Sequence, residues 1–349
     1  MASSLKRFIY QNYFMKRINC CLTILAILFV FIMLKGWLRE GEDESVEALY
    51  AKDPGLCNQN IQSLHLQIRE LKAQLLTNGL SVPDTSNLPT IFVITPTYAR
   101  PNQLAELNRL RNVLLHIPQV WWLLVEDREE KSELVKNFLT HSGVPHTHLH
   151  QPTPPEWKVK DKSPRWTKPR GVLQRNAALD WLRKNADPHL PAVVYFADDD
   201  NSYSIELFQE MRWTSQVSVW PVGLVGGVMV ERPLCLCRQG VEPDQARPMV
   251  TGWLVGWKPE RPFPTDMAGF AVNLRLLLDN PDASFSLESE IGFMETDFLS
   301  RIVTKEELEP KAECCTKVLV WHMNAVNPNL KDEVRLRQLG RQTDIGIDV

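Results

Sequence analysis

The sequence predicts an α/β fold built on a mostly parallel sheet. Between residues 90 and 200, short apolar runs alternate with helical patterns in the order β-α-β-α-β, as in parallel sheets covered by helices. The run 192–197 is wholly apolar, as expected of a buried central strand, and it leads directly into three consecutive aspartates. Ligands of such sheets bind at the carboxyl ends of the strands. These features predict a Rossmann-type, nucleotide-binding half over residues 89–200.

The residues before this region predict a membrane anchor and a stem. Residues 20–34 form an uninterrupted apolar run that, extended to Leu38, is just long enough to span a bilayer. Basic residues precede the run and acidic residues follow it, so the N-terminus is expected in the cytosol. We therefore predict a cytoplasmic tail (1–18), a transmembrane signal anchor (19–38) and a lumenal stem (39–88). A cleaved signal peptide is the alternative, although no small-residue cleavage site follows the run.

The stem carries a short heptad pattern that indicates a coiled coil. Its a and d positions are Cys57, Ile61, Leu64, Ile68, Leu71 and Leu75. Two parallel helices paired along this seam would bring their Cys57 thiols together, which predicts a disulfide-linked homodimer. A single amphipathic helix is the alternative, because the pattern spans fewer than three heptads.

Charge and cysteine content narrow the class of protein. The chain has 349 residues and a formal net charge of −3, which argues against bulk nucleic-acid binding. A lumenal location permits disulfides, and one bridge is expected between the pair Cys235 and Cys237 and the pair Cys314 and Cys315. Spacing alone leaves its connectivity open. The spacings fit structural zinc sites poorly.

The elements of the first half follow one another closely. The patterns predict strands at 90–95, 120–125 and 146–150 and helices at 103–116, about 129–140 and 171–184, before the strand 192–197. The strand 120–125 ends in Glu126 and Asp127. Two strands thus end in acidic residues, which favours a shared site at one edge of the sheet.

The triplet Asp198, Asp199 and Asp200 predicts a metal site. Adjacent carboxylates repel one another unless a cation offsets the charge, and oxygen ligands suit Mg²⁺ or Mn²⁺ completed by nucleotide phosphates. A solvated acidic turn is the alternative. The second half, 201–349, has short strands at 217–220 and 223–229, a proline-rich loop at 257–264 and a strand at 317–322 that ends in His322. It is expected to bind the acceptor.

Several segments, taken together and in order, resemble the animal β-1,3-glucuronyltransferase family, whose members have the GT-A fold. They are TPTY (95–98), VYFADDDN (194–201), VSVWPV (217–222), DMAGFAV (266–272) and VLVWH (318–322). The resemblance implies a Mn²⁺-dependent Golgi membrane enzyme of type II topology. Such an enzyme transfers glucuronic acid, with inversion, from UDP-glucuronate to the 3-hydroxyl of a galactose-terminated glycan on proteoglycan core proteins.

The resemblance also implies roles for individual residues. Donor binding falls to Tyr98 and Asp127 at uracil, to Arg170 and Arg175, to Asp198 and Asp199 at ribose and sugar, to Asp200 as the direct Mn²⁺ ligand and to His322 at the diphosphate. Acceptor binding falls to Glu231, Trp257, Arg261 and Asp266, and Glu295 is the expected catalytic base. From the pattern alone, Glu295 is an ordinary helix residue.

One departure from the family leaves alternatives open. The family usually has Thr-Arg after the histidine, whereas this chain has Met323 and Asn324. Asparagine supplies no charge, so Mn²⁺ and His322, or another cation such as Arg335 or Arg337, would have to stabilise the leaving diphosphate. The alternatives are an inactive glycan- or nucleotide-binding protein and a metal-dependent phosphohydrolase. The acceptor is also open, between the proteoglycan linkage region and the N-acetyllactosamine used by relatives that build the HNK-1 epitope.

Overall fold

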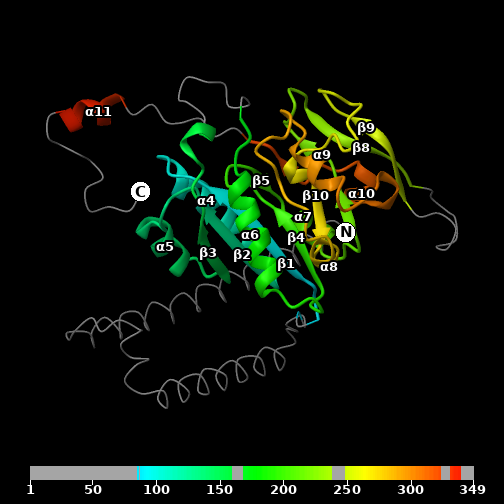
Figure 1. Cartoon of the computed structure of the whole chain (residues 1–349), viewed down its shortest axis with the longest axis horizontal. Coiled ribbons are helices and arrows are strands. Elements are labelled where there is room, and N and C mark those ends of the chain that lie inside the picture. The colour runs from blue at the N-terminus through cyan, green and yellow to red at the C-terminus, as the bar shows by residue number, and fades with distance from the viewer. Residues whose placement is uncertain (1–84, 86, 159–167, 238–247, 324–330, 339–349) are drawn as a thin grey trace, which may run out of the picture. The chain divides into compact units, whose positions relative to one another are not determined.

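The structure is a computed structural model, shown in Figure 1. It describes residues 85, 87–158, 168–237, 248–323 and 331–338. The predicted tail, anchor and nearly all of the stem, including Cys57, lie outside these residues, so the structure does not test them. Within the described ranges, no helix combines the length and apolar character needed to cross a bilayer.

The larger sheet has seven strands and is mixed. Its order is β11 (Leu308–Pro310), β6 (Val217–Val219), β10 (Phe270–Asn273), β4 (Ala192–Phe196), β1 (Thr90–Thr97), β2 (Val120–Glu126) and β3 (His146–His150). β1 pairs in parallel with both β2 and β4, and β3 is parallel to β2. β10 runs antiparallel to its neighbours β4 and β6. The carboxyl ends of β1, β2 and β4 therefore meet at one edge of the sheet.

Alternating side chains of the strands supply two cores, one on each face of this sheet. On one face, Val93, Trp122 and Tyr195 belong to a cluster that includes residues of α4 (Gln103–Leu114), α5 (Glu133–Thr140) and α7 (Ile205–Met211). On the other face, Phe92 and Phe196 belong to a cluster with α6 (Val172–Asn185), α8 (Leu274–Asp279) and α9 (Met294–Leu299). The central strands are therefore buried on both sides, as their continuous apolar sequence predicts.

A smaller sheet of five strands follows the order β5 (Ser202–Tyr203), β12 (Val320–Trp321), β7 (Val222–Gly223), β8 (Val230–Leu236) and β9 (Met249–Leu254). Figure 1 shows the β8–β9 ribbon with α9 and α10 (Ala312–Cys315) at the end of the domain away from β3 and α5. A disulfide joins Cys237, just after β8, to Cys314 in α10. It is one of the pairings that the cysteine spacing left open. The remaining elements are η1 (Pro155–Trp157), η3 (Met267–Gly269), η4 (Lys305–Glu307) and α11 (Lys331–Gln338).

The alternation predicted for residues 90–200 is confirmed, because every predicted strand and helix is present there. The helix expected from about residue 129 begins only at Glu133, where Ser132 caps it by accepting a hydrogen bond from the Val135 N–H. The strand predicted over 223–229 is wrong beyond Gly223. Gly226 and Gly227 have φ of 60° and 75°, so this stretch is a turn into β8.

The boundary predicted at residue 200 divides the sequence but not the larger sheet. β6, β10 and β11 come from the second half and extend the sheet built by β1–β4. The antiparallel strand β10 lies directly against β4, so residues that follow β4 and residues around β10 come close together. This arrangement brings the two predicted halves of the site into contact.

Candidate active site

Two arginines neutralise two of the three aspartates that follow β4. Asp198 Oδ1 accepts a hydrogen bond of 2.5 Å from Arg175 Nη2. The buried Asp199 carboxylate lies 2.7 Å from Arg100 Nη2 and accepts a hydrogen bond of 2.6 Å from the Thr97 hydroxyl. These are charge-assisted contacts in a largely dry setting, where such contacts are strong. Asp198 and Asp199 therefore already have partners in the protein alone.

Asp200 is the aspartate whose charge is not balanced in this way. Its carboxylate has no hydrogen bond or ion pair with any described residue, and only its backbone oxygen is held, by Arg109 at 2.6 Å. Burial, with the neighbouring charges of Asp198 and Asp199, raises the pKa of Asp200 to about 6. A cation at this point would relieve the repulsion. Among the described residues, no group of three or more His, Cys, Asp or Glu side chains is placed to hold a metal ion.

The ends of β1 and β2 form a second corner of the site. The backbone N–H of Asp127 donates to the backbone oxygen of Thr97 at 2.8 Å. Asp127 Oδ1 accepts from the Thr153 N–H at 2.6 Å. Tyr98 is exposed, and the Arg100 guanidinium lies 4.5 Å from its ring centroid. One ring face is thus covered by a cation while the side chain remains open to solvent. Tyr98 and Asp127 accordingly lie next to each other at the sheet edge.

Arg170 and Arg175 occupy different environments. Arg175 is buried near the start of α6, and besides Asp198 it holds the Arg170 backbone oxygen at 2.8 Å. Its Nε has no hydrogen-bond partner among the described residues. Arg170 is exposed just before α6. The glycine between them, Gly171, has φ of 70°, and a Cβ there would lie 2.6 Å from Arg175 Nη1, so the close approach requires glycine.

His322 and Asp266 form a pair that joins the two halves of the predicted site. His322 follows β12, and its Nδ1 lies 3.4 Å from Asp266 Oδ2. Asp266 Oδ1 also accepts from the Ala268 N–H at 2.9 Å at the start of η3. The close contact with the Asp266 carboxylate raises the pKa of His322 to about 9, so this imidazole is protonated at neutral pH. Burial would raise the pKa of Asp266, but the contact with His322 outweighs it and the pKa is lowered.

Glu295 lies in the first turn of α9. Burial raises its pKa to about 7, and the charge of Asp266 adds to this effect, whereas Arg175 and Arg261 partly oppose it. Asp266, Arg175 and Arg261 therefore lie within electrostatic range of the Glu295 carboxylate. A carboxylate with a pKa near neutrality is suited to general base catalysis at physiological pH.

The remaining acceptor candidates lie in β8 and in the loop 257–261. Glu231 is buried in β8, and its Oε1 accepts from the Gly256 N–H at 3.2 Å. Burial raises the pKa of Glu231. Trp257 is 40% exposed, so part of its indole ring faces solvent. Arg261 is buried and its guanidinium donates to the backbone oxygens of Lys258, Trp257 and Gly292. The guanidinium donors of Arg261 are therefore largely occupied by backbone oxygens and hold the loop in place.

Gly292 fixes the position of Trp257 relative to α9. It has φ of 75°, and a Cβ there would lie 2.4 Å from the Trp257 ring. No side chain fits without displacing that ring. The loop and the helix are tied further by a hydrogen bond of 2.9 Å from the Thr296 hydroxyl to the Phe263 oxygen. Trp257 is thus held close to the segment that leads into Glu295.

The sequence reasoning missed Arg100. It contacts the Tyr98 ring, pairs with Asp199 and hydrogen-bonds Glu106 at 2.5 Å, so it links the nucleobase corner to the aspartates. Its place two residues after the segment 95–98 was the available signal. Met323 is partly exposed, and its N–H donates to Asn201 Oδ1 at 3.1 Å. Asn324, which replaces the expected arginine, lies outside the described residues.

Comparisons of the sequence with known proteins agree on one family. The sequence profile described as glycosyltransferase family 43 matches residues 110–326. A human protein named galactosylgalactosylxylosylprotein 3-beta-glucuronosyltransferase 3 is 46% identical over 304 residues, which cover 83% of this chain and 88% of that protein. The mouse protein named galactosylgalactosylxylosylprotein 3-beta-glucuronosyltransferase 2 is 53% identical over 249 residues, covering 70% and 72%. One solved structure, a crystal structure of S. aureus TarS 1-349, has a TM-score of 0.40 at 16% identity, and the match covers 67% of this chain and 60% of that one.

Proposed function

The chain belongs to glycosyltransferase family 43, and on that premise we propose that it transfers glucuronic acid, with inversion, from UDP-glucuronate to the 3-hydroxyl of a terminal galactose. The names of its relatives support this activity, and the chain aligns with 88% and 72% of the length of two of them. The structural observation that carries the proposal is Glu295 in the first turn of α9, a carboxylate whose pKa is raised to about 7 by burial and by the charge of Asp266.

In the proposed reaction, the acceptor hydroxyl attacks the anomeric carbon from the face opposite UDP. The new glycosidic bond forms as the bond to the diphosphate breaks, and Glu295 takes the hydroxyl proton. Asp266 and Glu231 carry further carboxylates in the same region and would accept hydrogen bonds from galactose hydroxyls. Trp257 offers an apolar ring face to the sugar, while Arg261 holds the loop that presents it.

On the donor side, Tyr98 would stack on uracil and Asp127 would bond its ring. Arg170 is free to meet the glucuronate carboxylate or the diphosphate, because its side chain is exposed, and guanidinium forks suit both groups. The protonated His322 would lie against the diphosphate. Asp198 and Asp199 would contact ribose and sugar through oxygen lone pairs that Arg175, Arg100 and Thr97 leave open.

The proposed cofactor is Mn²⁺, and the residues fit it. Asp200 is a carboxylate with no cationic partner among the described residues, at a strand end, and such oxygen ligands suit Mn²⁺. The donor diphosphate would have to provide further ligands, as is common for divalent ions at nucleotides. When bound, the ion would neutralise charge on the departing diphosphate. Asn324 carries no charge and cannot neutralise the diphosphate. His322 would therefore supply the positive charge of the protein beside it.

The proposed acceptor is the galactose that ends the linkage region of proteoglycans, because the names of the similar relatives specify a galactosylgalactosylxylosyl protein. An N-acetyllactosamine acceptor is the second candidate, since the segment Asn273-Leu274-Arg275-Leu276 is similar to the corresponding segment of the relatives that build the HNK-1 epitope.

The chain would act in the Golgi lumen, anchored by residues 19–38. A homodimer linked through Cys57 is checked on a non-reducing gel, where Cys57→Ser should run as a monomer.

The activity is tested by incubating the full-length chain with labelled UDP-glucuronate, Mn²⁺ and either galactosyl-galactosyl-xyloside or N-acetyllactosamine. Product on the first acceptor supports the proposal, and product only on the second supports the other acceptor. Release of UDP without product would point to a hydrolase. Binding of UDP-glucuronate without turnover would show an inactive binding protein and refute the proposal.

A further inference from the structure

Helix α4 buries polar side chains beside the apolar ones that pack it against the larger sheet. Leu107, Leu110 and Leu114 belong to the core on that face of the sheet. Gln103 and Glu106, near the start of the helix, are almost as well buried, with 2% and 6% of their surface exposed. Residues of these two types are rarely buried unless their polar groups find partners. The start of α4 therefore does more than pack.

Glu106 holds the guanidinium of Arg100. Glu106 Oε2 accepts a hydrogen bond of 2.5 Å from Arg100 Nη2, and Glu106 Oε1 accepts one of 2.8 Å from Asn102 Nδ2. The same Nη2 atom of Arg100 lies 2.7 Å from Asp199 Oδ1. The side chains of Arg100, Glu106 and Asp199 are all less than 10% exposed. One guanidinium nitrogen is therefore held between two buried carboxylates by strong, charge-assisted contacts.

Two further residues of α4 reach the aspartates. Gln103 Nε2 donates to the Thr97 hydroxyl at 3.1 Å, and that hydroxyl donates to Asp199 Oδ2 at 2.6 Å. Arg109 Nη2 donates to the backbone oxygen of Asp200 at 2.6 Å. Residues three apart are neighbours on a helix, and this spacing joins Gln103, Glu106 and Arg109. One side of α4 thus holds both carboxylate oxygens of Asp199, through intermediates, and the backbone of Asp200.

The position of Arg100 also matters to Tyr98. The guanidinium lies 4.5 Å from the centroid of the Tyr98 ring, and its Nη1 donates to the Tyr98 backbone oxygen at 3.1 Å. Without the charge of Glu106, Arg100 would keep Asp199 as its anionic partner in this cluster. The guanidinium would then rotate toward Asp199 and away from the ring. Glu106 therefore fixes Arg100 between the ring expected to stack on uracil and a carboxylate expected to meet the donor.

We propose that Glu106 is a positioning residue for the donor, acting through Arg100 on the Tyr98 ring and the Asp199 carboxylate. Arg109 has a smaller role of the same kind, through the backbone of Asp200. The inference rests on the proposed function, because it takes a uridine diphosphate sugar as the donor. The contribution of α4 is to hold these groups in place before the donor binds, which lowers the cost of ordering them on binding.

The test measures the affinity of the full-length chain for UDP by calorimetry in the presence of Mn²⁺. Glu106→Gln keeps the size of the side chain but removes its charge, and it should weaken UDP binding about tenfold, equal to about 1.4 kcal/mol. Because Glu106 acts through Arg100, the same substitution made in Arg100→Gln should cause no further loss. The KM for the acceptor, measured at saturating donor, should stay unchanged in Glu106→Gln.

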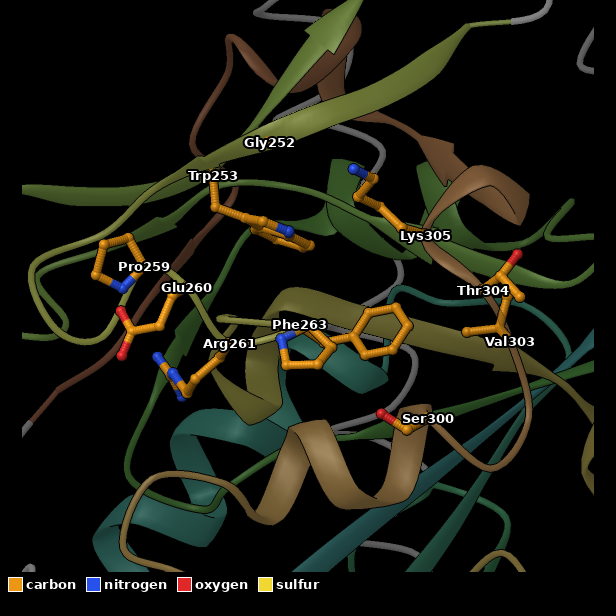
Figure 2. Close-up of a pocket in the computed structure, with 11 residues that line it drawn as sticks. Gly252, Trp253, Pro259, Glu260, Arg261, Phe263, Ser300, Val303, Thr304 and Lys305 are labelled. Carbon is orange, nitrogen blue, oxygen red and sulfur yellow. The ribbon is translucent and has the colours of Figure 1, made fainter.

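A second arm tests Arg109. Arg109→Ala removes one hydrogen bond to the backbone of Asp200 and should weaken UDP binding about threefold. Lys305→Ala is the control, because it also removes one positive charge. Figure 2 shows Lys305 beside a cavity of about 540 Å³ whose lining residues belong neither to α4 nor to the aspartate triplet. Lys305→Ala should bind UDP as the wild type does, and an equal loss in both variants would overturn the role of Arg109.

Arg212→Gln is the control for Glu106→Gln, because it also disturbs a buried polar network. Arg212 is buried and donates to the backbone oxygens of Pro89 and Pro118, which precede β1 and β2 at the edge opposite the aspartates. Thermal melts should show that this control is destabilised, yet its affinity for UDP should stay that of the wild type.

Unchanged UDP affinity in Glu106→Gln, or an equal loss in Arg212→Gln, overturns the positioning role. A further loss from Glu106→Gln in the Arg100→Gln background also overturns it, since Glu106 would then act by another route. If Arg100→Gln does not fold, the comparison of Glu106→Gln with Arg212→Gln carries the test. Binding of UDP by the wild type is measured first. Its absence would refute the proposed donor itself, so the two failures are distinguishable.

Discussion

The imidazole of His322 lies 3.4 Å from the carboxylate of Asp266, and this pair joins the proposed donor and acceptor sides of the site. His322 follows β12 of the smaller sheet, while Asp266 precedes the strand β10 of the larger one. This contact with the Asp266 carboxylate raises the pKa of His322 to about 9. The protein therefore keeps a positive charge beside the aspartates, where the family usually has an additional arginine after the histidine.

The first prediction concerns this pair. In Asp266→Asn, the pKa of His322 should fall from about 9 toward its ordinary value near 6.5. The imidazole is then largely neutral at pH 8 and still charged at pH 5.5. We expect UDP affinity in the presence of Mn²⁺ to drop several-fold at pH 8 and to change little at pH 5.5, together with a higher KM for galactoside. Calorimetry at both pH values checks this. The exposed Glu288→Gln is the control, and an equal loss at both values would show that His322 is not the group responsible.

The second prediction concerns Asp200. Asp200→Asn removes the one carboxylate of the triplet that lacks a cationic partner among the described residues, so Mn²⁺-dependent UDP binding should weaken by tenfold or more, about 1.4 kcal/mol. The fold should not suffer. Because the folded pKa is raised to about 6, ionised Asp200 costs stability above that pH, and the variant should melt at an equal or higher temperature at pH 7.5. Unchanged Mn²⁺-dependent affinity would contradict the assignment. Asp180→Asn, on an exposed face of α6, serves as the control.

The third prediction concerns the disulfide between Cys237 and Cys314, which are 77 residues apart in the sequence. Closing so long a loop restricts the unfolded chain, and losing such a bond typically costs about 2–5 kcal/mol. The double variant Cys237→Ser/Cys314→Ser should therefore unfold at a lower urea concentration. Because the bond ties the end of β8 to α10, and β8 carries Glu231, a rise in the KM for acceptor should accompany the loss. Equal stability of wild type and variant, both measured without reductant, would refute the bond's role.

The donor half could be predicted from the sequence because each element carries its own signal. The strands β1, β2 and β4 contain the continuous apolar runs 91–94, 120–125 and 192–196, and the positions of Asp127 and Asp200 follow from where the last two runs end. Their charge balance could not be predicted in the same way. Which aspartate remains without a cation depends on Arg100 and Arg175, which reach the triplet from outside β4. Only the folded sheet brings them together.

The acceptor half shows the limit more sharply. The segment 223–229 has the apolar content of a strand, yet the positive φ of Gly226 and Gly227 turns the backbone away from an extended path. Gly226 also has to lack a side chain, because the Glu231 carboxylate lies against it. A Cβ at Gly226 would lie 2.0 Å from Glu231 Oε1. Glu295 lies in a helix of six residues that has no distinguishing pattern. Its character comes from burial and from Asp266, which belongs to another element, so only the resemblance to a family could indicate it.

The last prediction tests Glu295 as the base. A general base contributes about 10²–10⁴-fold to a rate, and Glu295→Gln keeps the shape of the side chain while removing its basicity. Turnover should fall by about that factor, while binding of UDP-glucuronate and Mn²⁺ stays near wild type. In the wild type, kcat/KM for the acceptor should fall about tenfold per pH unit below about 7, where Glu295 becomes protonated. The residual rate of the variant should not show this fall at acidic pH.

The same substitution has an opposite effect on stability, which separates loss of the base from loss of the fold. Because the folded pKa of Glu295 is raised to about 7, the native state binds a proton more tightly than the unfolded chain, and stability falls as pH rises from about 4.5 to 7. Above pH 7 the ionised carboxylate destabilises the fold, so Glu295→Gln should be more stable than wild type at pH 8, by about 1–3 kcal/mol, and nearly equal at pH 4.5. Denaturant titrations at the two pH values measure the difference. A variant that is less active and also less stable at pH 8 would mean that Glu295 supports the structure, and Glu231 or Asp266 would then be the next candidate for the base.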